Sequence, residues 1–408
     1  MNPLTSSQDR SIFSNLLVLE LASVLAGPAV GMFFAELGAT VIKVENPAGG
    51  GDVTRSWKLP GEAAGNDISA YFASVNWGKR SIALDLTVPK GRVVVFDLVR
   101  RADVAIASYK PGDDRKLGLD YPALAEINPQ LIYGQISGYG ADDPRTGYDA
   151  ILQAACGFTY MNGEAGGQPV KMPVALIDLL AAHQLKEALL VGLIRRLTTG
   201  EGSHAHISLL QAGIASLANQ AANWLVAGHV PERLGSEHPN IVPYGSIYRT
   251  ADGKEIVLGV GNDAQFRHLC RVLERPELSG DPDYASNPLR VQNRLQLHAE
   301  LAEAIGTFPR DELIWALNEQ KVPAGGILSM PEVFQQPGGD ALLMQGRNGA
   351  GTGITGLRTL AFQSSALTGR IDLSPPPHLG EHAGEICETY LDYPPEKIAA
   401  LQGAKIML

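Results

Sequence analysis

The first half of the chain alternates short apolar runs with longer amphipathic ones. Five runs have the length and composition of buried strands: residues 15–22, 39–45, 80–86, 103–109 and 131–139. Between them lie stretches with helical periodicity, such as 26–38, which has Pro28 near its start and Gly38 at its end. Strands that alternate with helices indicate a parallel sheet with right-handed crossovers. The expected fold class is therefore α/β, with a doubly wound, Rossmann-like large domain.

Two helices of this half can be bounded more closely. Thr87 suits the N-cap of a helix that continues through the apolar residues after it. A longer helix is predicted from about Asp178 to Gly200. Apolar residues occupy most of the circumference of this second helix, so we expect it to be buried.

The pattern changes after about residue 225. Residues 244–261 indicate a β-hairpin with Asp252-Gly253 in its turn, and helical patterns follow. These features predict a smaller α+β domain over 225–330, after a large domain over 1–224. The glycine-rich stretch 345–356 is typical of a loop.

Composition excludes several classes of protein. A chain of 408 residues exceeds what one core usually covers, which agrees with two domains. The formal net charge of −10 argues against nucleic acid as a partner. We expect no membrane span, because no run of 18 apolar residues occurs, and no secretion signal, so a cytoplasmic location is predicted. Cys156, Cys270 and Cys387 lie too far apart for a disulfide framework or a zinc site.

One carboxylate, Asp178, interrupts the apolar run KMPVALIDLLAAHQ at residues 171–184. It could cap the long helix, which is the commoner role of such a residue. It could also be a nucleophile, because a helix N-terminus favours the ionised form and apolar neighbours leave it poorly hydrated. The two interpretations are compatible.

Several cations lie near predicted strand ends and in loops, where open parallel sheets bind their ligands. They are Lys43, Arg55, Lys79, Arg80, Lys110, Arg115 and Lys116. A phosphate-rich ligand could use them, together with the amides exposed at Ala26-Gly27-Pro28; ordinary solvated charge is the alternative. The absence of GxGxxG argues against a dinucleotide enzyme. His204 and His206 lack further ligands at a suitable spacing, so we predict no metal site.

Nine stretches, in order along nearly the whole chain, resemble the class III CoA-transferases, the CaiB/BaiF family that includes formyl-CoA transferase. They are LAGPAVGMFFAELGATVIKVENP, GGDVTR, NWGKRSIALDL, ISGYG, GYDAILQAACGF, VALIDLLAA, RRLTTGEG, NIVPYGSIYRTADG and PPPHLGEHAGE. The resemblance implies a homodimer of two ring-shaped subunits linked like links of a chain, with residues 331–408 returning to the large domain. The substrates would be an acyl-CoA and a carboxylic acid, with no permanently bound cofactor.

The resemblance also implies roles for individual residues. Asp178 matches the catalytic aspartate, which would carry the reaction through aspartyl anhydrides and an aspartyl-CoA thioester. The residues expected to bind CoA are Val24, Leu25, Ala26, Asn46, Lys79, Lys110, Lys116 and Ser137. Asn46 stands where an arginine is common, which implies one phosphate contact fewer. Segment 234–245 matches the glycine-rich lid of some relatives but is shorter and poorer in glycine.

Two further implications concern the reaction and its substrates. The α-methylacyl-CoA racemases of the same superfamily carry G-H-D where this chain has Gly147-Tyr148-Asp149, and a tyrosine is a poor proton donor or acceptor near neutral pH. Transferase activity is favoured over racemisation, over NAD-dependent oxidation and over CoA binding without catalysis. Similarity to the succinate–hydroxymethylglutarate type suggests dicarboxylic acids and succinyl-CoA, with Arg290 or Arg294 as ligand of a distal carboxylate.

Overall fold

The computed structural model describes residues 11–347, 351, 353–367 and 369–408, which form two compact units. The large unit contains the described residues up to Cys156, together with Met172–Ala221 and Ala341–Leu408. The small unit contains Gly157–Lys171 and Ala222–Asp340. The second unit is therefore inserted into the chain of the first, and it also takes in a short segment, 157–171, that the hydrophobic pattern did not set apart.

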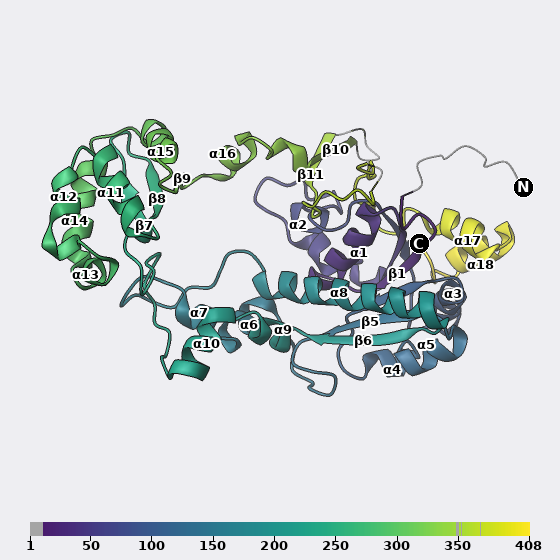
Figure 1. Ribbon diagram of the computed structural model, residues 1–408. Coiled ribbons are helices and arrows are strands. Elements are labelled where there is room, and N and C mark those ends of the chain that lie inside the picture. Colours follow the sequence, from purple (N-terminus) through teal and green to yellow (C-terminus); the bar gives the residue numbers. More distant parts are fainter. Residues whose placement is uncertain (1–10, 348–350, 352, 368) are drawn as a thin grey trace, which may run out of the picture. The chain divides into compact units, whose positions relative to one another are not determined.

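The large unit is built on a six-stranded parallel sheet in the order β3-β2-β1-β4-β5-β6. Figure 1 labels β1, β5 and β6 of this sheet. Its strands are β1 (Leu17–Leu21), β2 (Thr40–Glu45), β3 (Lys79–Ala83), β4 (Val104–Ala107), β5 (Ile132–Ser137) and β6 (Ser203–Ser208). The five strands predicted from the hydrophobic pattern are confirmed, as is the α/β class. The strand order reverses between β1 and β4, which is where sheets of this kind bind ligands.

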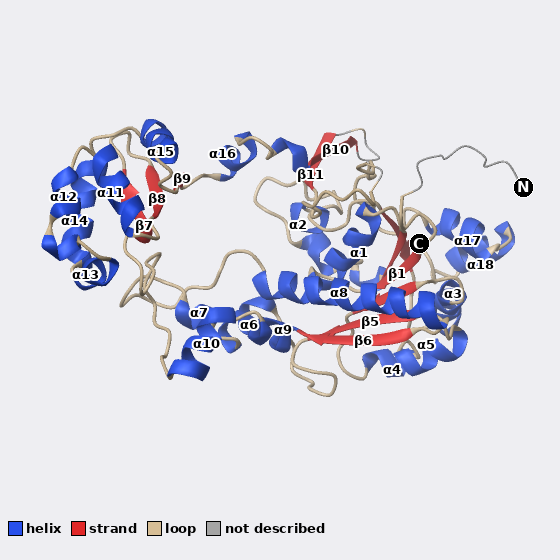
Figure 2. Ribbon diagram, viewed as in Figure 1, coloured by secondary structure: helices blue, strands red, loops and turns tan. Residues whose placement is uncertain are grey.

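Helices cover both faces of the sheet (Figure 2). On one face α1 (Ala26–Glu36) and α8 (Leu176–Thr199) pack against each other and against the strands. On the other face lie α3 (Pro89–Val99), α5 (Tyr121–Ile127), α17 (Ala383–Leu391) and α18 (Pro395–Gly403). Shorter helices of this unit are α2 (Ala70–Ala73), α4 (Asp113–Leu117), α6 (Asp149–Ala155) and α9 (Leu209–Ala215).

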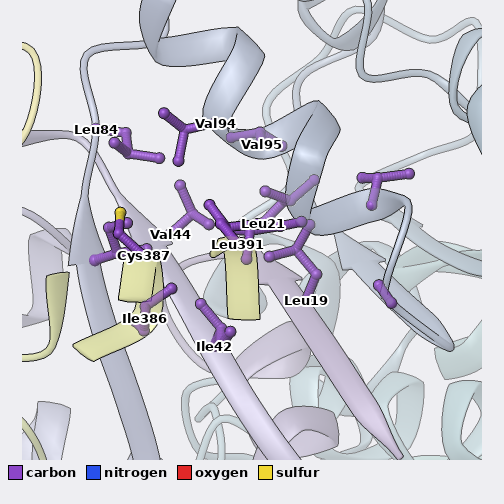
Figure 3. Close-up of a cluster of buried hydrophobic side chains, with 14 of the residues drawn as sticks. Leu19, Leu21, Ile42, Val44, Leu84, Val94, Val95, Ile386, Cys387 and Leu391 are labelled. Atoms are coloured by element: carbon purple, nitrogen blue, oxygen red, sulfur yellow. The ribbon is translucent and has the colours of Figure 1, made fainter. Parts of the chain in front are cut away.

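The C-terminal helices complete the core on that second face. Figure 3 shows Ile386, Cys387 and Leu391 of α17 packed with side chains of β1 and β2, including Leu19 and Ile42. All five of these residues are buried. The N-terminal strands and the C-terminal helices therefore share one hydrophobic core.

Two helix predictions need correction. Thr87 is not the N-cap of α3, because the helix begins at Pro89 after Val88, and the Thr87 hydroxyl donates to Asp85 instead. The helix that ends at Gly200, α8, is not buried all round. Val191, Ile194 and Leu197 on one of its faces are 66%, 61% and 84% exposed in the single chain.

The small unit has a three-stranded antiparallel sheet of β7 (Tyr244–Arg249), β8 (Glu255–Gly259) and β9 (Ala324–Gly326). The predicted hairpin is confirmed, with Gly253 of its turn at φ +75°. The helices that accompany it are α7 (Phe158–Met161), α11 (Asp263–Val272), α12 (Pro276–Gly280), α13 (Asn287–Gln292), α14 (Arg294–Ile305), α15 (Arg310–Glu319) and α16 (Met330–Gln335). Helix α10 (Ala218–Ala227) begins in the large unit and ends in the small one.

The glycine-rich stretch 345–356 is not simply a loop. Its described residues belong largely to β10 (Leu343–Arg347) and β11 (Gly353–Leu357), which pair antiparallel. A Cβ on Gly356 would lie 2.3 Å from the buried indole of Trp77, so this glycine serves close packing of the hairpin. Across the described chain, no helix has the length and apolar character needed to cross a membrane.

Candidate active site

A cleft of about 210 Å³ opens at the carboxyl ends of β1, β4 and β5. Its walls are the loop residues 23–27, 108–111, 136–138 and 145–149, with Asp178 and Leu209. The cleft therefore lies at the point where the strand order reverses, which is the usual ligand site of a doubly wound sheet.

Asp178 lies in the first turn of α8 and is only 7% exposed. Across the residues that the structure describes, its carboxylate has no hydrogen-bond partner. Burial and, to a smaller extent, the charge of Asp149 together raise the pKa of this carboxyl to about 7. The cleft thus contains a carboxylate that is poorly solvated and unpaired.

The first turn of α8 is capped by a different residue. One oxygen of Asp149 accepts the backbone N–H of Ile177 at 2.7 Å and that of Asp178 at 3.4 Å. The interpretation of Asp178 as the helix cap is therefore wrong: the residue before the helix is Ala175, which makes no side-chain cap, and Asp149 supplies the acceptor from α6. This arrangement leaves the Asp178 carboxylate free of backbone bonds.

The side chain of Gln153 links Asp149 to the segment that leads into α8. Its buried amide nitrogen donates to Asp149 Oδ2 at 2.6 Å, and to the carbonyls of Met172 and Val174. Its amide oxygen accepts the N–H of Met172 at 2.8 Å. We call Asp149 and Gln153 the α8 clasp, because together they fix the segment that leads into the helix.

The opposite wall of the cleft is the loop between β1 and α1, which carries Val24, Leu25 and Ala26. Val24 has φ +73°, a region that β-branched residues rarely adopt. Both oxygens of Asp52 accept its N–H at 3.2 Å. The loop then enters α1, whose first-turn amides lie at the cleft. A helix N-terminus at this place favours negative charge on a ligand.

A second cleft of about 270 Å³ lies beside the first at the ends of β2, β1 and β4. It shares Ser23, Ser108 and Tyr109 with the first cleft, and Asn46 and Thr87 are on its far side. The two clefts therefore form adjoining space along one edge of the sheet, long enough in combination for an extended ligand.

Comparison with known proteins identifies the family. The model for CoA-transferase family III matches residues 13–383. The chain belongs to CoA-transferase family III. It is 42% identical to the succinate–glutarate CoA-transferase of Agrobacterium fabrum over 381 residues, which covers 91% of this chain and 94% of that protein.

Two further proteins support the assignment. The human succinyl-CoA:glutarate CoA-transferase is 36% identical, with 96% of this chain and 88% of that protein covered. A crystal structure of a CaiB/BaiF family protein from Brucella suis matches with a TM-score of 0.84 and 40% identity, covering 94% of this chain and 100% of that chain. The predicted resemblance is confirmed, and the protein is a CoA-transferase.

The structure brings five of the expected CoA-binding residues of this CoA-transferase to the first cleft. They are Val24, Leu25, Ala26, Lys110 and Ser137. Asn46 lies in the second cleft. Lys116 lines neither cleft; it is exposed and paired with Asp113 at 2.8 Å. Arg145, which sequence reasoning missed, lines the first cleft and stacks on Tyr139.

Lys79 is not placed where a phosphate could reach it. Its ammonium is buried and donates to Glu20 Oε2, to the carbonyl of Pro28 and to Asn76 Oδ1, at 2.7–2.9 Å. These bonds use all three of its donors. Burial lowers the pKa of Lys79 to about 8 against the opposing effect of Glu20. The geometry argues against direct phosphate contact by Lys79.

Two other cationic side chains form ion pairs within the protein. Arg55 is buried and binds both oxygens of Glu45, and Lys43 is buried beside Glu20 and Asp52. In the large unit, none of these side chains reaches the first cleft. Lys43 lines the second cleft, but its charge, like that of Arg55, is compensated inside the fold, which argues against a phosphate contact by either residue.

The two arginines expected to bind a distal carboxylate have structural partners in the small unit. Arg290 is buried, bonds the carbonyls of Val242 and Tyr284, and pairs with Asp263 at 2.6 Å. Arg294 donates to the carbonyls of His238 and Pro239. Both thus anchor segment 234–245, and Arg290 has no free edge for a ligand.

The remaining candidates have local partners. His204 stacks on Tyr121 and bonds Gln135, while His206 bonds Ser137. Cys156 is buried and donates to the carbonyl of Leu210. No histidine is among the described residues that line the first cleft, where Tyr148 stands at the position of the racemase histidine.

Proposed function

We propose that the protein transfers CoA from succinyl-CoA to a dicarboxylic acid of the glutarate class. The names of the Agrobacterium and human relatives support this choice of donor and acceptor. The proposal depends on one observation. The carboxylate of Asp178 is buried and unpaired, and it lines a cleft at the edge of the sheet where such folds bind ligands.

Asp178 acts as the nucleophile in this proposal. An oxygen of its carboxylate attacks the thioester carbon of the donor, the C–S bond breaks, and a mixed anhydride and the CoA thiolate result. The thiolate then attacks the carbonyl carbon of Asp178, which releases the donor acid and leaves an aspartyl-CoA thioester. Each product has an energy close to that of its precursor, so a difficult exchange is divided into easier steps.

The second half of the reaction repeats the first in reverse. The acceptor carboxylate attacks the aspartyl thioester, which gives a second anhydride and thiolate. Attack of the thiolate on the acyl side forms the new acyl-CoA and restores Asp178. Because anhydrides hydrolyse, the site must exclude water while they exist, and the low exposure of Asp178 supports this requirement.

The two adjoining clefts would hold the acyl-CoA. The thioester end lies in the first cleft, against Val24, Leu25 and Ala26, and Lys110 and Ser137 line the same space. The nucleotide end extends into the second cleft past Asn46. Lys116 lies on the surface of the same unit, where it could attract phosphates only over a longer distance.

We also propose that two copies form the interlocked homodimer of the family. The exposed apolar face of α8, with Val191, Ile194 and Leu197, supports a partner surface in the large unit. In the small unit, Leu225 and Val226 of α10 are 78% and 87% exposed.

Light scattering should give twice the chain mass, and replacement of Leu197 by Glu should reduce the dimer fraction. A monomeric wild-type protein would contradict the proposal.

An oxygen label tests the mechanism directly. The enzyme is incubated with succinyl-CoA and glutarate labelled with ¹⁸O in both carboxylates. Attack by the labelled acceptor and release from the acyl side leave one ¹⁸O on Asp178, which mass spectrometry of the peptide detects. Transfer of CoA without label in this peptide would exclude the anhydride route.

Substitution of Asp178 tests its role by activity. Asp178→Ala should abolish exchange between succinyl-CoA and glutarate and leave CoA binding largely intact. Glu187→Gln, which changes an exposed carboxylate on the same helix, is the matched control and should retain activity. Substantial transfer by the Ala variant would refute the assignment.

A pH profile tests the ionisation state. Because the pKa of Asp178 is raised to about 7 and the nucleophile must be ionised, kcat/KM for succinyl-CoA should increase up to about pH 7 and level off above it. A profile that is flat between pH 5.5 and about 8 would be inconsistent with this nucleophile.

A further inference from the structure

Four buried charged side chains lie beneath the β1–α1 loop, and the proposed reaction uses none of them. They are Glu20, Lys43, Asp52 and Lys79, and each is at most 4% exposed. Lys43 Nζ lies 2.9 Å from Glu20 Oε1 and 2.9 Å from Asp52 Oδ2, and Lys79 Nζ lies 2.7 Å from Glu20 Oε2. We call them the buried quartet. Hydrophobic residues would fill such a space at less cost, so the charges need another explanation.

The quartet bonds the backbone of the loop on both sides of its turn. Lys43 Nζ donates to the carbonyl of Ala22 at 2.9 Å. Two residues later, both oxygens of Asp52 accept the N–H of Val24. A cation and an anion that are themselves paired therefore fix the carbonyl and the amide that flank the turn.

The other end of the quartet reaches the start of α1. Lys79 Nζ donates to the carbonyl of Pro28 at 2.8 Å, and Glu20 links Lys79 to Lys43. The loop is thus held at three backbone positions, before, within and after the residues that line the first cleft. Those residues include Leu25 and Ala26.

The turn needs such support because Val24 is strained. A β-branched residue at φ +73° is a steric outlier, and such strain persists only where the surroundings enforce it. The N–H of Val24 is the group that Asp52 holds. Removal of that acceptor should let the residue relax to negative φ, which would move the cleft wall.

We infer that the buried quartet is a positioning device that holds the β1–α1 loop in the conformation that binds acyl-CoA, with Asp52 as its principal positioning residue. The inference rests on the proposed function of the first cleft. It gives Lys79 and Lys43 a role through the loop in place of the phosphate contact that the sequence suggested.

Two quartet variants and one control test the inference. Asp52→Ala and Lys79→Met should each weaken the binding of CoA, measured by calorimetry, by about tenfold or more, because a charge-assisted bond to the loop is lost. In kinetic measurements the same substitutions should raise KM for succinyl-CoA more than they lower kcat. The control is Glu36→Gln, which removes a buried carboxylate of α1 that lies outside the quartet and bonds Thr359. This variant should have a lower Tm and an unchanged CoA affinity.

Substitutions of Val24 test the strain itself, whether or not the quartet variants fold. Gly tolerates positive φ and Ala does not, so Val24→Gly should have a higher Tm than Val24→Ala. Val24→Gly added to Asp52→Ala should also recover part of the lost CoA affinity, because glycine adopts the turn without the bond to Asp52.

The outcomes separate this inference from the proposed function. If the wild-type protein binds no CoA, the proposed function fails. If the wild type binds CoA and the folded quartet variants bind it equally well, the quartet only stabilises the fold and the inference is overturned. A Gly variant at position 24 that is less stable than the Ala variant would overturn it as well.

Discussion

At the scale of single residues, the chemistry of the cleft depends on two carboxylates with different surroundings. Asp149 accepts hydrogen bonds from the backbone and from Gln153, whereas Asp178, adjacent to it, has none. Hydrogen bonds to the ionised form favour it, and burial without them disfavours it. Asp149 therefore holds the start of α8, whereas the Asp178 carboxylate is available for the proposed reaction.

The first prediction concerns the stability cost of the reactive carboxylate. The pKa of Asp178 is higher in the folded state than its ordinary value, so stability is fully present at low pH and is lost as pH rises toward about 7. Asp178→Asn should therefore stabilise the protein more at pH 8 than at pH 5. The difference should be on the order of 2–3 kcal/mol at most, because part of the cost is already present at pH 5, and urea unfolding measures it. An equal effect at both pH values would contradict the burial of an ionised Asp178.

The second prediction concerns the neighbouring charge. Asp149→Asn keeps an acceptor for the N–H of Ile177 but removes the charge that raises the pKa of Asp178. The midpoint of the kcat/KM profile should move to lower pH, while the folded structure persists in far-UV circular dichroism. An unchanged midpoint would show that the two carboxylates do not interact.

At the scale of secondary-structure elements, the first cleft lies at the N-terminal ends of three helices. Helix α8 presents Asp178, α6 contributes the residue that caps it, and α1 follows the loop of the opposite wall. None of these helices is capped by its own preceding side chain. For α8 the acceptor comes instead from Asp149 of α6, which ties the start of α8 to that neighbouring helix.

The third prediction concerns the α8 clasp. Gln153→Leu removes the bonds to Asp149, Met172 and Val174, and should destabilise the protein by about 2 kcal/mol and reduce kcat. Gln135→Leu is the matched control, because it loses bonds to Asp114 and His204, neither of which lines the first cleft. It should lower stability without lowering kcat. If both variants affect kcat equally at a temperature where both are folded, the clasp has no special role.

The sequence predicted the strands and the poorly hydrated setting of Asp178 better than it predicted the partners of the charged residues. Strand positions follow from local apolar patterns, and Asp178 is conspicuous in an apolar run. The spacing of Lys79 says nothing about whether it is solvated or buried, because Glu20, its partner, lies 59 residues away. The Asp149–Ile177 bond spans 28 residues and has no local signal.

At the scale of the whole chain, the large unit is assembled from segments far apart in the sequence. His378 and Leu379 bond Asp67, the Gly380 N–H bonds Ser81, and Met407 bridges Leu84. The core shared by α17, β1 and β2 joins the two ends of the described chain (Figure 3).

The fourth prediction follows from this shared core. Removal of residues 375–408 would expose buried side chains of β1, β2 and α3 to water. The shortened protein should lose its near-UV circular dichroism, bind the dye ANS and fail to bind CoA. A shortened chain that still unfolds cooperatively and binds CoA would show that the C-terminal helices are dispensable.

Because the shared core includes C-terminal residues, the large unit can complete its fold only late in translation. The β1–α1 loop and Asp178 leave the ribosome before residues 383–407, which complete the helical layer over one face of their sheet. The inserted small unit has its own core and can fold while the ribosome is still translating. The CoA site is therefore finished only when nearly all of the chain is made, so a stalled or truncated nascent chain should yield no active enzyme.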